Sequence, residues 1–93
     1  MNSSFDLTYV RFLGGTTLEG KISMVVDDPK GYCRIATDTV CTVEHQPGNP
    51  IPKFLREEST TKPTAQNPSS SIVMTVKAGS LFYVRKESVL SFA

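Results

Sequence analysis

Few residues in this chain have types and spacings suited to catalysis or metal binding. His45 is the only histidine. It stands beside a long proline-rich segment with no cysteine nucleophile near it, so we expect a solvated position at a strand end. Cys33 and Cys41 are the only cysteines. Their separation is not typical of metal ligands, and two-residue alternation places both on one strand face. The sequence therefore predicts two core thiols, no metal, no cofactor and no enzymatic activity.

The glycines in residues 9–22, YVRFLGGTTLEGKI, have structural rather than chemical roles. Gly14 and Gly15 do not form a phosphate-binding loop, because neither a lysine nor a helix start follows them. They are typical of a tight hairpin turn, since glycine reaches positive φ without steric cost. Gly20 lies inside a strand pattern, where a glycine usually marks a sharp bend or a close backbone approach.

The composition limits the possible classes of protein. Ten Lys and Arg against nine Asp and Glu give a net charge of +1, which argues against coating nucleic acid by bulk charge but allows a small basic patch. The chain has no long apolar run and no signal-peptide pattern, so we expect no membrane partner and an intracellular location, nuclear or cytoplasmic. Ninety-three residues are enough for one domain, residues 1–93.

Strand patterns dominate the sequence, and no helical stripe is visible. We predict five strands, at residues 7–13, 16–26, 32–45, 71–85 and 88–93. A proline-rich segment at about 46–71 separates the third strand from the fourth and is predicted to be a long loop. Its one apolar cluster, residues 51–55, could dock on a partner or pack back on its own barrel.

Five strands of these lengths favour an all-β fold, a small, strongly bent antiparallel barrel of five strands. The short last strand would form an edge that stays unpaired unless another chain completes it. The pattern therefore favours association with a neighbouring subunit through this edge.

The pattern resembles the Sm/LSm (Sm-like, Hfq-related) family through two motifs in the right order. The first motif combines alternating apolar residues, a turn ending in glycine, a second glycine and an aliphatic residue: here Val10, Phe12, Gly15, Gly20 and Ile22. The second is an apolar strand followed by Arg-Gly, a polar residue and a short apolar strand. It is matched by Arg85, Ser88 and Val89, with Lys86 in place of the glycine.

This chain departs from the family pattern in three ways. About six residues precede the first predicted strand, so the N-terminal helix of the family is minimal or absent. The family's acidic residue can be Asp27 or Asp28, with an insertion before it, and the register with Asp28 and Tyr32 is preferred because it places Ile35 at an aliphatic core position. The family's asparagine is missing in either register.

The resemblance implies a ring subunit that binds single-stranded, uridine-rich RNA in RNA processing, splicing or decay. Its partners would be that RNA and other Sm-like subunits, in a homomeric or heteromeric ring. Each subunit of the family binds one base between two turns, and the matching positions here are Asp28, Lys30, Gly31, Tyr32, Arg85 and Lys86. Arg85 would stack on a base or contact phosphate, and Tyr32 would supply a stacking face.

Other interpretations of these residues remain open. Asp27, Asp28 and Pro29 also make an ordinary turn, Arg85 could pair with Glu87 or Asp28, and Tyr32 could cap the core. The alternative function is an Sm-like assembly module that oligomerises through strand edges and has lost RNA binding. A peptide-binding SH3-like or Tudor-like barrel is less consistent with the sequence, because the aromatic residues do not cluster.

Overall fold

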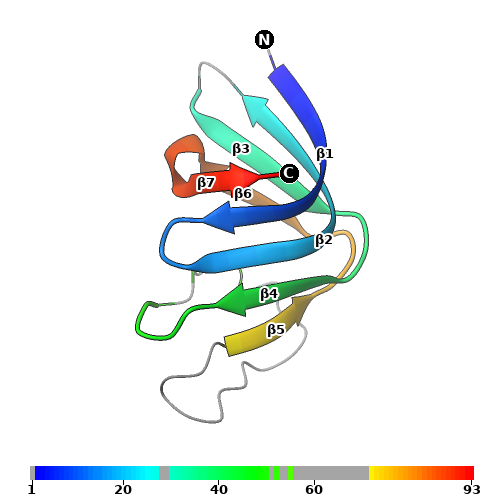
Figure 1. The fold of residues 1–93 in the computed structure, drawn as a ribbon. Coiled ribbons are helices and arrows are strands. Elements are labelled where there is room, and N and C mark those ends of the chain that lie inside the picture. Colours follow the sequence, from blue (N-terminus) through cyan, green and yellow to red (C-terminus); the bar gives the residue numbers. More distant parts are fainter. Residues whose placement is uncertain (1, 28–29, 51, 53–54, 56–71) are drawn as a thin grey trace.

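The computed structural model describes residues 2–27, 30–50, 52, 55 and 72–93. Within these residues the chain forms seven β-strands and one short 3₁₀ helix (Figure 1). They are β1 (Asn2–Phe12), β2 (Thr16–Asp27), β3 (Tyr32–Thr37), β4 (Cys41–His45), β5 (Ile72–Val76), β6 (Leu81–Arg85), η1 (Lys86–Ser88) and β7 (Val89–Phe92). The all-β prediction is confirmed.

There are seven strands rather than five because two predicted strands are each interrupted once. The segment 32–45 divides into β3 and β4, and the segment 71–85 divides into β5 and β6. Thr37 connects the two interruptions: its hydroxyl donates to the Lys77 carbonyl at 2.9 Å and accepts from the Ser80 N–H at 3.0 Å. Gly79 allows the second interruption through a φ of +83°.

The first strand begins earlier than the sequence pattern predicts. β1 pairs with β2 from Asn2 opposite Asp27 to Phe12 opposite Thr16, and the register shifts between Leu7 and Tyr9. Residues 2–6, expected before the first strand, therefore form strand and not helix. The prediction of a minimal or absent N-terminal helix agrees with this arrangement.

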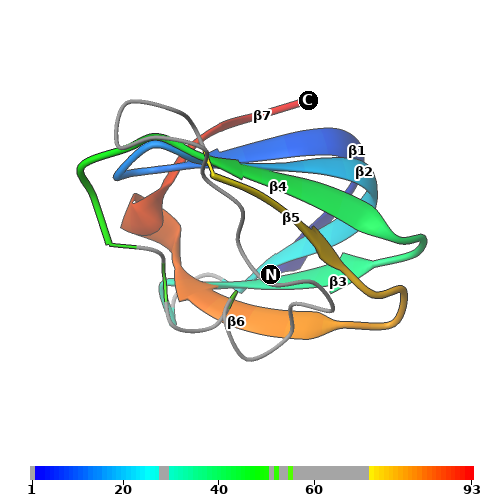
Figure 2. The same ribbon diagram turned by 90° about the horizontal axis from the view of Figure 1, so that it is seen from below.

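The sheet is antiparallel and folds over into two layers, with β4 and β5 in one and β3 and β6 in the other (Figure 2). β2 belongs to both layers, because Thr16–Glu19 pair with β4 whereas Ile22–Asp27 pair with β3. Among the described strands, β5 pairs only with β4, β6 only with β3 and β7 only with β1. The predicted barrel is thus strongly bent but open.

The core lies between the two layers and follows the alternation of the strands. In β3, β4 and β6 every second residue is buried, as expected for strands with one face toward a core. The buried apolar residues are Leu7, Val10, Phe12, Leu18, Ile22, Met24, Cys33, Ile35, Cys41, Val43, Leu55, Met74, Val76, Phe82 and Val84. Both cysteines are buried thiols outside any disulfide, which confirms the predicted core thiols.

Gly20 lies where β2 changes partners and bends. Its φ is +147°, and a Cβ built on it would lie 2.6 Å from the Cys41 Sγ atom. Real Cβ atoms do not approach sulfur so closely, so this position requires glycine for its backbone angle and for its contact with β4. The predicted bend is therefore present, and its partner is Cys41.

His45 is buried, so the predicted solvated position is wrong. It lies opposite Thr16 in the β2–β4 pairing and is 0% exposed. Its Nε2 atom is 2.7 Å from the Asn49 carbonyl oxygen, which can only accept, so Nε2 carries the proton. In the neutral ring, Nδ1 then accepts from the Thr16 hydroxyl at 2.6 Å. Both ring nitrogens have partners, which makes His45 a structural residue.

Replacing His45 with alanine should lower the free energy of unfolding by about 2 kcal/mol, because the buried Thr16 hydroxyl loses its acceptor and a cavity forms. The neighbouring Glu44, which is exposed, provides the matched control, and Glu44→Ala should change stability by less than about 0.5 kcal/mol. Urea denaturation of both variants measures the difference. Equal stabilities of the two variants would refute the structural role of His45.

Most of the predicted proline-rich loop, residues 46–71, lies outside the described residues. Leu55 is described: it is fully buried in the core, and its N–H donates to the Pro52 carbonyl at 3.1 Å. At Leu55, the segment packs back on its own sheet, which was one of the two alternatives for this apolar cluster.

Candidate nucleic-acid interface

Five of the six predicted RNA-binding residues lie where β3 begins and β6 ends. Lys30 and Gly31 form the end of the turn between β2 and β3, and Tyr32 is the first residue of β3. Arg85 is the last residue of β6, and Lys86 is the first of η1. We call these five residues, Lys30, Gly31, Tyr32, Arg85 and Lys86, the turn cluster. The sixth predicted residue, Asp28, lies outside the described residues.

Backbone pairing brings the two halves of the turn cluster together, although Tyr32 and Arg85 are far apart in the sequence. These two residues are opposite each other in the antiparallel β3–β6 pair. One step beyond the pair, the Lys86 N–H donates to the Gly31 carbonyl at 2.9 Å. Gly31 has a φ of +78°, and its own N–H donates to the Asp27 carbonyl at 3.0 Å. The turn and the end of β6 are thereby held in one fixed arrangement.

Tyr32 and Arg85 form a cation–aromatic pair on the outer face of the sheet. The guanidinium carbon of Arg85 lies 5.8 Å from the centre of the Tyr32 ring, within the range of a cation–π contact. Tyr32 is 44% exposed, so the ring does not cap the core, which was the alternative role for it. A planar ring and a guanidinium are therefore both available to a ligand.

Arg85 also has an acidic neighbour. Its Nη1 atom is 3.8 Å from the Glu87 Oε1 atom, and both side chains are about two-thirds exposed, at 68% and 70%. The pairing with Glu87 proposed from the sequence is therefore present. An ion pair so exposed to water contributes little to stability, so it leaves Arg85 able to exchange Glu87 for a phosphate.

Two residues that the sequence pattern did not single out lie directly beside the turn cluster. Arg34 follows Tyr32 by two residues on β3, and Tyr83 precedes Arg85 by two on β6; these two residues are opposite each other. Both are exposed, Tyr83 by 64%. Alternation would have placed each on the outer face, but only the β3–β6 pairing shows that they are neighbours.

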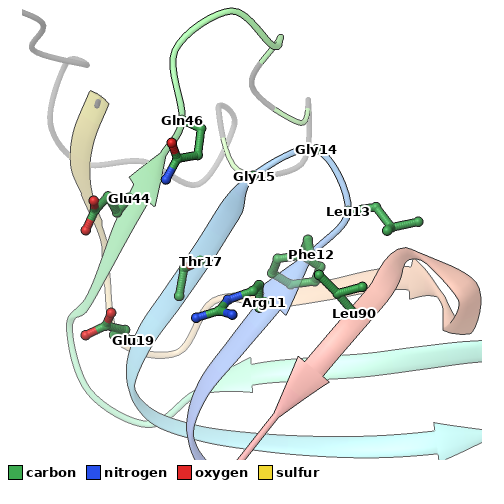
Figure 3. Close-up of a pocket in the computed structure, with 10 residues that line it drawn as sticks. All are labelled: Arg11, Phe12, Leu13, Gly14, Gly15, Thr17, Glu19, Glu44, Gln46 and Leu90. Atoms are coloured by element: carbon green, nitrogen blue, oxygen red, sulfur yellow. The ribbon is translucent and has the colours of Figure 1, made fainter. Parts of the chain in front are cut away.

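A hollow lined by charged side chains lies elsewhere (Figure 3). It has a volume of about 420 Å³ on the outer face of β1, β2 and β4, and Arg11, Glu19 and Glu44 face it. None of the turn cluster lines it. Its single arginine is accompanied by two carboxylates, which repel a phosphate chain. Single-stranded nucleic acid binds where exposed rings and cations lie together without carboxylates that outnumber the cations, so the turn cluster is the better candidate.

Cys41 offers no alternative chemistry. Burial raises the pKa of the Cys41 thiol above its ordinary value of 9.0, which keeps it protonated and unreactive at neutral pH. Cys41 points toward the backbone, with its Sγ atom 3.4 Å from the Thr39 carbonyl oxygen. In the part of the chain that the structure describes, no three histidine, cysteine or carboxylate side chains group as metal ligands would.

Comparison with known protein families, curated proteins and solved structures finds no match to this chain. Across residues 2–27, 30–50 and 72–93, the structure contains no helix with the length and apolarity needed to cross a membrane. The geometry of the turn cluster is therefore the basis for a functional assignment.

Proposed function

We propose that this protein is an Sm-like subunit that binds single-stranded, uridine-rich RNA through the turn cluster and assembles with other Sm-like subunits through its strand edges. The observation that carries the proposal is the pairing of Tyr32 with Arg85, where β3 and β6 place an exposed ring and an exposed guanidinium 5.8 Å apart. Such a subunit would act in RNA processing, splicing or decay.

The chemistry of the turn cluster suits a single strand better than a duplex. An unpaired base can stack on the Tyr32 ring, whereas bases inside a duplex are already stacked on one another. Arg85 and the exposed Lys30 supply positive charge beside that ring, which attracts the phosphates on either side of the base. The net charge of +1 means that this local patch, and not the whole surface, would attract RNA.

Exposed apolar side chains at both ends of the sheet support assembly. On β7, Leu90 is 59% exposed and Phe92 is 40% exposed; on the other side, Leu81 of β6 and Val73 of β5 are each 45% exposed. Edge strands that expose apolar residues are typical of strand-to-strand association. If β7 pairs with the β5–β6 side of a neighbouring subunit, the contact joins two different surfaces, head to tail. Repeating this contact closes a ring when the rotation from one subunit to the next adds up to a full turn.

Fluorescence anisotropy with labelled oligouridine tests RNA binding directly. The protein should bind the single strand with an affinity that falls as salt concentration rises, and should bind oligouridine annealed to oligoadenine more weakly. Equal affinity for both forms would contradict recognition of unpaired bases. Absence of binding to either form would leave the assembly module, the second candidate, which the exposed apolar edges favour.

A further inference from the structure

The outer face of β3 and β6 carries two tyrosines and two arginines in a checkerboard. In the first row, Tyr32 of β3 is opposite Arg85 of β6; in the second row, Arg34 of β3 is opposite Tyr83 of β6. Each row therefore contains one aromatic ring and one guanidinium, with their order reversed. The first row belongs to the turn cluster, and the second row, Arg34 and Tyr83, is called the second pair.

The rows are spaced for two successive nucleotides of an extended strand. Residues two apart on a strand are separated by about 6.6 Å, and diagonal neighbours such as Tyr32 and Tyr83 by roughly 7–8 Å. Stacked bases in a strand are only about 3.4 Å apart. Two bases on these two rings would thus be separated from each other, each stacking on its own tyrosine, as in sequence-tolerant single-strand sites.

A small hollow lies beside the two tyrosines. Tyr32, Arg34 and Tyr83 line a shallow hollow of about 70 Å³ together with Val25 and Asp27 of β2. This volume is too small for a whole base, so a ligand would lie across the tyrosines and not inside the hollow. Asp27 stands at its edge, opposite Tyr32, where its carboxylate can accept a hydrogen bond from the edge of a base.

The charges around the second pair favour a phosphate. Arg34 has Val25 opposite it on β2 and Tyr83 opposite it on β6, so neither directly paired neighbour is acidic. Asp27 is only a diagonal neighbour of Arg34. Arg34 shares its hollow with one carboxylate, that of Asp27, whereas Arg11, near its own tyrosine Tyr9 at 6.0 Å, shares its hollow with two, those of Glu19 and Glu44. The hollow beside the second pair therefore has fewer carboxylates than the hollow beside Arg11 on β1, so a phosphate is repelled less there.

We propose that the second pair, Arg34 and Tyr83, is a further nucleotide-binding site that extends the turn cluster along β3 and β6. Tyr83 stacks on one base of a single-stranded RNA, and Arg34 contacts the adjacent phosphate, while Tyr32 and Arg85 hold the neighbouring nucleotide. This inference rests on the proposed function and adds to it the direction of the strand across the subunit surface.

Anisotropy titrations with labelled oligouridine, using variants of the second pair, provide the affinity test. Tyr83→Ala should weaken binding about fivefold or more, because one base no longer stacks, whereas Tyr83→Phe, which keeps the ring, should stay within about twofold of wild type. Arg34→Ala should weaken binding. It should also make the plot of the logarithm of the binding constant against the logarithm of salt concentration less steep, by about 0.7 for each phosphate that Arg34 neutralises. Arg11→Ala removes the same charge from the other Arg–Tyr arrangement and should change neither quantity.

Tyrosine emission gives a second and independent measurement. The chain has no tryptophan and three tyrosines, of which Tyr32 and Tyr83 lie on the checkerboard. RNA should quench the emission of these two. Tyr83→Phe should therefore reduce the loss of emission that RNA causes, while affinity stays within about twofold of wild type. Tyr9→Phe should leave that loss of emission unchanged. Thermal unfolding of each variant, expected near the wild-type midpoint because the positions are exposed, shows that the fold is retained.

The outcomes separate this inference from the proposed function. If Tyr32→Ala weakens binding but Tyr83→Ala and Arg34→Ala do not, the second pair is not a binding site and the turn cluster stands alone. Equal quenching in wild type and Tyr83→Phe would also overturn the inference. If wild-type protein does not bind oligouridine, the proposed RNA function fails and the second pair fails with it.

Discussion

Replacing Gly20 with alanine should lower the free energy of unfolding by about 4 kcal/mol, roughly twice the effect expected for His45→Ala. One part of this cost is the backbone, because a φ of +147° is disfavoured for a residue with a Cβ. The other part is the clash with Cys41, whose Sγ would lie 2.6 Å and whose Cα would lie 3.2 Å from the new atom. Overpacking of this kind typically costs about 1–3 kcal/mol. Because β2 changes partners here, relief of the clash would disturb both layers of the sheet.

Gly14→Ala is the matched control for this experiment. Its φ of +91° is also positive, but a Cβ there would have nothing within 4 Å, so only the backbone cost remains, about 1–2 kcal/mol. A second control repeats Gly20→Ala in a Cys41→Ala background, where removal of the sulfur should reduce the effect. Urea denaturation measures the stability of every variant. If Gly20→Ala and Gly14→Ala cost the same, the close approach of β2 to β4 does not determine stability.

Removing both Tyr32 and Arg85 side chains should reduce oligouridine affinity by about 100-fold. Stacking of one base contributes about 1–3 kcal/mol, and a hydrogen bond to a charged group contributes about 1.5–3 kcal/mol. The two side chains contact each other, so the effects of the single alanine variants should not simply add. Together their removal costs about 3 kcal/mol, and each 1.4 kcal/mol corresponds to about tenfold in affinity.

Glu87→Gln is a control variant in which RNA affinity should rise instead of fall. The Glu87 carboxylate, 3.8 Å from Arg85, competes with a phosphate for the guanidinium, so its neutralisation should tighten RNA binding. Anisotropy titrations of the double variant and of Glu87→Gln should therefore move in opposite directions. Unchanged affinity in the Tyr32→Ala, Arg85→Ala double variant would contradict the assignment of the turn cluster.

Much of the fold could be predicted because local rules determine it. Alternation identified the residues of five strand segments, and the glycines at 14, 15 and 20 identified a turn and a bend. The interruptions after Thr37 and Val76 were not predictable in the same way, since they depend on hydrogen bonds between segments about 40 residues apart, from Thr37 to Lys77 and Ser80. The strand at residues 2–6 was missed because its pairing with the end of β2, and not its composition, makes it strand.

The candidate site was predictable to a similar extent. The resemblance to the Sm/LSm family pointed to Tyr32 and Arg85, and the structure places them opposite each other. Arg34 and Tyr83 were missed because their proximity depends on which strands pair. His45 was misjudged because its place beside the predicted loop suggested solvent, whereas Thr16 and the Asn49 carbonyl satisfy both ring nitrogens in the interior. Most of the missed or misjudged residues contact partners that are far apart from them in the sequence, and local patterns do not reveal such contacts.

The central claim, an assembling subunit that binds a single strand of RNA, is tested most directly by native mass spectrometry of the full chain with and without oligouridine. The subunit mass is 10.2 kDa. We expect particles of several subunits, alone if the ring is homomeric or together with co-expressed Sm-like partners, and a further increase by the mass of the oligouridine when RNA is added. A particle that remains a single 10.2 kDa chain under both conditions, with no bound RNA, would contradict the account.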